Sequence, residues 1–162
     1  MSILRNTPTS PLPEFEYTID VAIIGAGACG LTAALAARDA GADVLVFERD
    51  KRPWGSTSMS LGAVCGVGSK EQQRHGIDDS AAAFVADVMA KTEQRADVRL
   101  ARLIGEHSGG VLDWLNETHH VPLLLDAKWT GLGYSSRRLH IPPGRNREEL
   151  LALLLNACAR AG

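Results

Sequence analysis

Residues 19–48 read IDVAIIGAGACGLTAALAARDAGADVLVFE. This stretch begins with a nearly continuous apolar run, which is typical of a parallel strand covered on both faces. Residues 28–40 are mostly Ala, Leu and Arg, which are strong helix formers, and Gly41 follows where a left-handed C-terminal cap is favoured. A second β-rich run covers residues 44–47. Strand, helix and strand in so short a stretch predict a right-handed parallel crossover, or βαβ unit.

Three glycines, Gly25, Gly27 and Gly30, form the pattern G-x-G-x-x-G between the first strand and the helix. The first allows a tight turn, the second lets the backbone approach a pyrophosphate, and the third permits close helix packing. The helix N-terminus offers free N–H groups and a partial positive charge to the anion. Glu48 ends the second strand, where its carboxylate can accept hydrogen bonds from an adenosine ribose. This context predicts a dinucleotide site. FAD and NAD both remain open, and the alternative is a glycine-rich turn without a ligand.

The overall composition is that of an ordinary globular protein with one domain. Of its 162 residues, 45% are apolar and 22% are charged. The net charge of -2 lacks the basic excess of a nucleic-acid binder. Cys29, Cys65 and Cys158 are too widely spaced to suggest a disulfide framework or a zinc site, so we expect a cytoplasmic protein without a metal. The apolar run over residues 21–37 is marginal in length and contains glycines, so no membrane span is expected.

The remaining chain predicts further elements. Residues 1–18 should be a flexible lead-in without the apolar region of a signal peptide. Residues 49–69 should form an extended loop with a short helical turn. The elements expected after it are a helix capped within residues 78–80, a helix from Asp97 that breaks or kinks at Gly109 and Gly110, a strand over 121–125, an irregular stretch over 131–144, and a last helix capped by Asn146.

The last residues, 157–162, have the same helix-end character as residues 36–41, but no strand follows them. A parallel sheet of two strands would leave much apolar surface uncovered. We therefore expect an incomplete domain, the N-terminal part of a longer protein.

With the unit over residues 25–48, then Arg49 and the loop GSTSMSLG over residues 55–62, the chain resembles the fumarate reductase and succinate dehydrogenase flavoprotein family, whose relatives include 3-ketosteroid dehydrogenases. The resemblance implies an α/β fold. A Rossmann-like FAD-binding βαβ unit (19–48) is followed by a flavin loop (49–69) and a mainly helical segment with one or two strands (70–162). Together these make an incomplete flavin domain. Trp54 and Ala63 stand where the family often has glycine, and both could shift the loop backbone.

The resemblance also implies FAD as cofactor and a set of binding residues. The glycines would meet the pyrophosphate and Glu48 the ribose, while Ser56 and Thr57 would bind phosphate or ribityl oxygens. Ser60 and Gly62 would lie near the isoalloxazine. Hydroxyls and backbone N–H groups suit these partners, although residues 56–60 could instead be an ordinary surface loop. The full set is Gly25, Ala26, Gly27, Ala28, Gly30, Glu48, Arg49, Gly55, Ser56, Thr57, Ser60 and Gly62.

The function implied is the FAD-binding portion of a flavin-dependent oxidoreductase that acts on CH–CH or conjugated C=C bonds of a small carbonyl-containing substrate. The alternative is a non-catalytic, truncated nucleotide-binding module that needs a partner chain or a missing C-terminal segment. Family members have a capping domain and a C-terminal segment that this chain lacks, so the resemblance leaves open whether the chain is itself an enzyme.

No side chain is assigned to catalysis or to a metal. Arg138 and His140 precede a proline-rich turn, and a structural or solvated pair is the favoured interpretation. His119 and His120 are neighbours that point in different directions, which makes a poor metal pair. Cys29 is interpreted as a small packing residue rather than a nucleophile.

Overall fold

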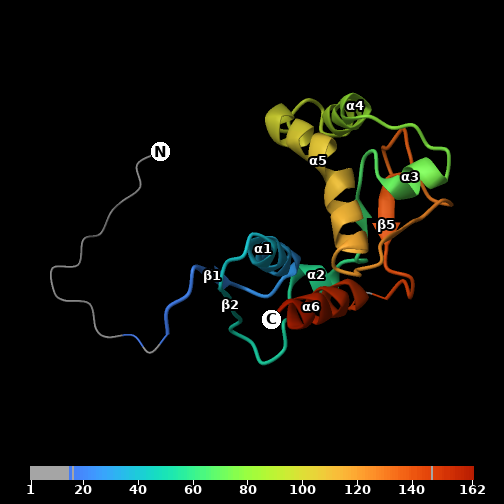
Figure 1. Ribbon diagram of the computed structural model, residues 1–162. Helices are drawn as coiled ribbons and strands as arrows, with labels where there is room; N and C mark the ends of the chain where they lie inside the picture. The colour runs from blue at the N-terminus through green and yellow to red at the C-terminus, as the bar shows by residue number, and fades with distance from the viewer. Residues whose placement is uncertain (1–14, 16, 147) are drawn as a thin grey trace.

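The computed structural model describes residue 15, residues 17–146 and residues 148–162 (Figure 1). Most of the lead-in expected over residues 1–18 therefore lies outside the described residues. The elements in chain order are β1 (Val21–Ile24), α1 (Ala28–Asp39), β2 (Val44–Phe47), α2 (Ser56–Met59), β3 (Val64–Cys65), α3 (Lys70–Arg74), α4 (Ala81–Lys91), α5 (Val98–Glu117), β4 (Leu124–Leu125), β5 (Leu139–Ile141) and α6 (Glu149–Ala161).

The βαβ unit predicted at the start of the chain is confirmed. β1 and β2 pair in parallel, with Val21 opposite Val44 and Ile24 opposite Phe47. Gly41 ends the connection after α1 with a φ of 83° and donates its N–H to the carbonyl of Arg38. A left-handed residue at this place is what favours glycine after the helix.

The two-stranded sheet is covered on one face only within the part of the chain that the structure describes. Val21, Ile23, Val44 and Val46 are half-buried, whereas Ile24 and Phe47 are 82% and 48% exposed. The expectation that the first strand is covered on both faces was therefore wrong for the described residues. The open face agrees with the expectation of an incomplete flavin domain.

A second, antiparallel sheet has the strand order β3-β5-β4. His140 of β5 lies between Val64 on one side and Leu125 on the other. The irregular stretch expected over residues 131–144 thus contains a short strand. Local sequence could not indicate it, because both partners of β5 are distant in the chain and its prolines suggested a loop.

A cap within residues 78–80 was expected for α4 and a helix start near Asp97 for α5, and both are confirmed. The Ser80 hydroxyl accepts the N–H of Ala83 at the start of α4, and the Asp97 carboxylate accepts the N–H of Arg99 at the start of α5. α3 was not predicted, and Ser69 is its N-cap. The last helix begins at Glu149, and its N-cap is Glu148 rather than the expected Asn146.

α5 continues through Gly109 and Gly110, so the expected break is wrong. A Cβ atom on Gly109 would lie 2.1 Å from the carbonyl oxygen of Val67, whereas a Cβ atom on Gly110 would meet nothing. Gly109 therefore lets the helix approach the backbone that follows β3.

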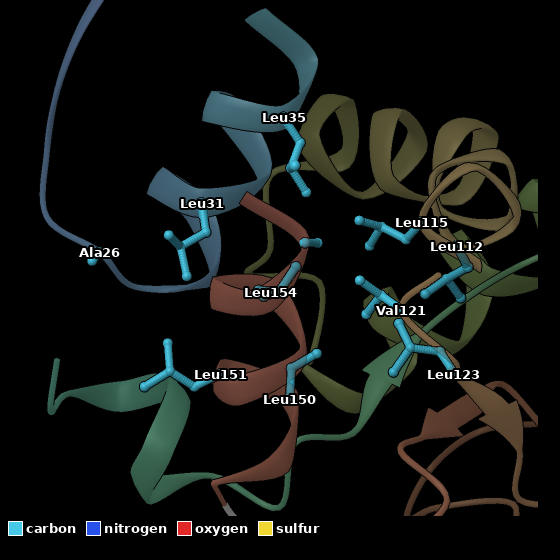
Figure 2. Packing of buried hydrophobic residues seen from close by; sticks show 11 residues of the cluster. Ala26, Leu31, Leu35, Leu112, Leu115, Val121, Leu123, Leu150, Leu151 and Leu154 are labelled. Carbon is cyan, nitrogen blue, oxygen red and sulfur yellow. The ribbon is translucent and has the colours of Figure 1, made fainter. Parts of the chain in front are cut away.

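The core lies between α1, α6 and the C-terminal end of α5 (Figure 2). Each fully buried leucine contributes roughly 1.5–3 kcal/mol through removal of apolar surface from water. The buried cluster contains Ala26, Leu31, Leu35, Leu112, Leu115, Val121, Leu123, Leu150, Leu151, Leu154 and Ala157. α6 packs against both α1 and α2, so the core holds the residues after β1 and the flavin loop close together.

Candidate dinucleotide site

The turn between β1 and α1 has the geometry that its glycines predict. Gly25 has a φ of 99° and donates its N–H to the Phe47 carbonyl over 2.7 Å. A Cβ atom on Gly30 would lie 2.0 Å from the Gly25 carbonyl oxygen and 3.3 Å from Cγ2 of Ile23. These two glycines are therefore required by the turn and by the close approach of helix and strand.

Gly27 differs from the other two glycines of the pattern. The nearest atom to an added Cβ would be Oγ1 of Thr57 at 3.6 Å, an ordinary van der Waals distance. The protein's own packing thus leaves room for a side chain at this position. A glycine here keeps the surface of the turn free for a ligand that approaches the backbone, which fits the pyrophosphate of a dinucleotide.

The flavin loop contacts the N-terminus of α1 through Thr57, whose Oγ1 accepts the N–H of Ala28 over 3.0 Å. The carboxylate of Glu48 reaches the same turn, and its Oε2 accepts the N–H of Ala26 over 2.9 Å. Two segments that follow the βαβ helix in sequence are therefore held against its first turn, where the helix dipole favours negative charge.

Glu48 is an ionised hydrogen-bond acceptor. Hydrogen bonds from the backbone N–H groups of Ala26 and Asp50 hold the pKa of its carboxyl below the usual 4.5. A carboxylate has about four lone-pair positions. Two accept these internal bonds, so Glu48 can still accept hydrogen bonds from ribose hydroxyls.

One cleft brings together half of the predicted site residues. Its lining comes from the phosphate turn, from the end of β2, from the flavin loop and from α6. The lining residues are Ala26, Gly27, Glu48, Pro53, Trp54, Gly55, Ser56, Thr57, Ser58 and Leu151. The sequence did not indicate Pro53, Ser58 and Leu151, because small or apolar residues carry no binding signal of their own. Trp54 was noted only as a departure from the family pattern.

Of the other predicted residues, Gly25, Ala28 and Gly30 lie in the turn and in the start of α1 and do not line the cleft. Gly62 is buried with a φ of 68°, and an added Cβ would touch Leu150 of α6 at 3.4 Å. Ser60 donates its hydroxyl to the Thr57 carbonyl and accepts the Gly62 N–H.

The remaining predicted residue, Arg49, carries an exposed guanidinium that pairs with Asp50. Arg49, Ser60 and Gly62 do not line the cleft.

Arg138 and His140 form part of a buried structural network. Arg138 is fully buried and bonds Asp79 over 2.6 Å and 2.7 Å, and it also pairs with Asp87. The carbonyl of Arg138 is 2.9 Å from Nδ1 of His140, while Nε2 of the same ring is 2.7 Å from Ser69 Oγ. Burial lowers the pKa of His140, so the ring is neutral, with Nδ1 donating and Nε2 accepting. Their burial and their contacts agree with the interpretation of these residues as a structural pair.

His119 is also structural. Its Nε2 lies 3.0 Å from Oδ2 of Asp39, which accepts the indole N–H of Trp114 as well. His120 has a φ of 53° and takes no part in this contact. Within residues 17–146 and 148–162, no group of three or more His, Cys, Asp or Glu side chains could hold a metal ion.

A larger, apolar groove of about 620 Å³ lies between α1 and α5. Cys29 is exposed and lines it, so the interpretation of Cys29 as a packing residue was wrong. None of the described helices is long and apolar enough to cross a membrane.

The chain was compared with known proteins. Residues 20–162 match the family model described as FAD binding domain. The probable fumarate reductase Ifc3 of Shewanella frigidimarina is 34% identical over 127 residues, which are 78% of this chain and 21% of that protein. The urocanate reductase of Eggerthella lenta is 31% identical over 151 residues, which are 93% of this chain and 25% of that protein.

Two solved structures are similar. The open conformation of a flavocytochrome c3 fumarate reductase gives a TM-score of 0.74 at 34% identity, over 91% of this chain and 26% of that one. The 3-ketosteroid-Δ4-(5α)-dehydrogenase of Rhodococcus jostii RHA1 also gives a TM-score of 0.74. Its identity is 26%, over 92% of this chain and 37% of that one. The chain thus spans about a quarter or less of the curated relatives reported above. The match over nearly all described residues shows that the chain belongs to the FAD binding domain family and that its cofactor is FAD rather than NAD.

Proposed function

We propose that the chain is the FAD-binding portion of a flavin-dependent oxidoreductase that acts on CH–CH or conjugated C=C bonds of a small carbonyl-containing substrate. The observation that carries the proposal is the contact between the glycine turn, Glu48 and Thr57 at the N-terminus of α1. Relatives named as fumarate and urocanate reductases support the type of reaction.

In this proposal the site residues have separate tasks. The turn from Gly25 to Gly30 faces the pyrophosphate with its backbone, and Glu48 accepts hydrogen bonds from the ribose. Ser56 and Thr57 are proposed to bind phosphate or ribityl oxygens, and Arg49 and Gly55 are proposed as further cofactor-binding residues near them in the chain. Ser60 and Gly62 belong to the side nearer the isoalloxazine. When bound, FAD supplies the hydride chemistry, while these residues bind and orient it.

The proposed division of the chain is a βαβ unit over residues 19–48, a flavin loop over 49–69 and a helical segment over 70–162. We also propose a cytoplasmic location, supported by the wide spacing of the three cysteines. Separate measurement of the flavin content of cytoplasmic and membrane fractions would test the location.

A non-catalytic nucleotide-binding module is the second candidate. The exposed apolar side chains of Ile24 and Phe47 favour it, because a partner segment would have to cover them. On this alternative the chain binds FAD but contributes no side chain to the reaction itself.

One experiment separates the two candidates. The purified protein is reconstituted with FAD, its flavin absorbance is measured, the flavin is reduced anaerobically, and reoxidation by fumarate, urocanate or a 3-ketosteroid enone is followed. The first proposal predicts one FAD per chain and reoxidation by an activated C=C bond. Bound FAD without reoxidation would favour the module, and a colourless protein would contradict both.

A further inference from the structure

Ser58 carries a buried hydroxyl without a partner. The residue lies in the short helix α2 and is 2% exposed. Its Oγ is the one buried side-chain nitrogen or oxygen among the described residues that makes no hydrogen bond with the protein. A serine hydroxyl donates one hydrogen bond and accepts two, and nearly all such buried groups in folded proteins are paired. This position therefore calls for a partner from outside the chain.

The other hydroxyl groups discussed in this loop either make hydrogen bonds within the protein or are exposed to water. Thr57 Oγ1 accepts the N–H of Ala28, and Ser60 Oγ bonds two backbone groups. Ser56 is exposed, so water can satisfy its hydroxyl. Ser58 alone in the loop is both buried and unpaired. An alanine would fill the same space without the cost of a desolvated hydroxyl.

The surroundings of Ser58 indicate what the partner is. Ser58 lines the same cleft as Gly27, Glu48 and Thr57. Glu48 is ionised and can only accept hydrogen bonds, whereas Ser58 can also donate one. A ribose hydroxyl donates and accepts, so one carboxylate and one serine hydroxyl together satisfy a ribose diol.

We propose that Ser58 is a further cofactor-binding residue whose hydroxyl bonds a ribose hydroxyl in the adenosine half of FAD, within the cleft that Glu48 also lines. This inference rests on the proposed assignment of the cleft to the adenosine diphosphate of FAD. It adds a residue that the family resemblance does not supply.

The substitution Ser58→Ala tests the inference, with ADP, 2′,3′-dideoxy-ADP and FAD as probes. Because no internal hydrogen bond is lost, the unfolding midpoint of the unliganded protein should not fall. Affinity for ADP and for FAD should fall about 5- to 10-fold, the size of one neutral hydrogen bond. Affinity for dideoxy-ADP should be the same for both proteins, since that probe lacks the ribose hydroxyls.

Ser135→Ala is the matched control, because Ser135 is an exposed serine that bonds Asp87 away from the cleft. It should leave the affinity for all three probes unchanged. If the alanine variant does not fold, Ser58→Cys keeps the volume and should weaken ADP binding in the same direction.

Two results would overturn the inference. Equal ADP affinity of wild type and Ser58→Ala would show that the hydroxyl does not touch the ligand. An equal loss of affinity for ADP and dideoxy-ADP would show that the effect does not come from the ribose hydroxyls. A wild-type protein that binds neither ADP nor FAD would instead overturn the proposed function of the cleft.

Discussion

At the scale of the residue, Gly27 and Gly30 belong to one pattern but serve different ends. Gly30 is required by the fold, since a Cβ atom would overlap the carbonyl of Gly25, whereas Gly27 has room for one. Substitution of Gly30 therefore tests folding, whereas substitution of Gly27 tests ligand binding.

Gly27→Val should therefore leave the protein folded and abolish FAD retention, because its side chain would occupy the approach of the pyrophosphate. Circular dichroism checks the fold and flavin absorbance checks the binding. Gly30→Ala is the contrasting variant, and it should lower stability or prevent folding. Stoichiometric FAD in the Gly27→Val protein would argue against the assigned phosphate turn.

Glu48→Ala should weaken FAD binding about tenfold, since a buried ribose hydroxyl would lose its charged acceptor. Titration of the reconstituted protein by flavin fluorescence measures this. Asp43→Ala provides a control, because Asp43 lies just before β2 and its exposed carboxylate is outside the cleft. An equal loss of FAD affinity in the Glu48→Ala and Asp43→Ala proteins would indicate a general effect of negative charge rather than a ribose contact.

Among the helices, α5 lies close to the backbone that follows β3 at Gly109. An alanine here would meet the Val67 carbonyl oxygen, whereas an alanine at Gly110 would meet open space. Gly109→Ala should lower the free energy of unfolding by roughly 1–3 kcal/mol, as overpacking does. Gly110→Ala should raise it by about 0.5–1 kcal/mol through helix propensity. Urea unfolding of the two variants measures whether their free energies of unfolding change in opposite directions. A change in the same direction would contradict the close contact between Gly109 and Val67.

The helices and strands also differ in how well the sequence alone could predict them. Ser80 and Asp97 act through neighbouring N–H groups, so the starts of α4 and α5 could be predicted from the local pattern. β5 depends on pairing with Val64 and Leu125, which are far along the chain, and no local signal marks it. The turn glycines and Glu48 follow a fixed spacing, but the burial of Ser58 depends on α6 and became visible only in the structure.

In the molecule as a whole, Arg138, which directly precedes β5, pairs with Asp87 of α4 and with Asp79, which lies just before that helix. Arg138→Met should lower the free energy of unfolding by about 3–5 kcal/mol, because two carboxylates would lose their buried partner. Thermal unfolding measures the loss, and Arg137→Met, an exposed neighbour, is the control. A loss below about 1 kcal/mol would show that water replaces the guanidinium.

The buried network also makes stability depend on pH. Burial holds the pKa of His140 below 6.5, so the unfolded chain binds a proton more readily than the folded one as the pH falls through 6.5. Burial alone would raise the pKa of Asp79, but hydrogen bonds from Arg138 and Gln72 outweigh it and keep the pKa below 3.8. The stabilisation that ionised Asp79 contributes is present above pH 3.8 and is lost as the pH falls below that value. Both groups therefore predict lower stability in acid, with the His140 loss beginning first.

Urea unfolding between pH 7.5 and 5.5 isolates the histidine, because Asp79 and Glu48 stay ionised throughout that range. His140→Gln should lower stability at pH 7.5, since the buried ring bonds Ser69 and the Arg138 carbonyl, and should flatten the decline of stability towards pH 5.5. His107→Gln, at an exposed site on α5, should keep the wild-type decline. If the stability of the His140→Gln protein falls with pH as steeply as that of the wild type, protonation of the buried ring is not what couples folding to pH.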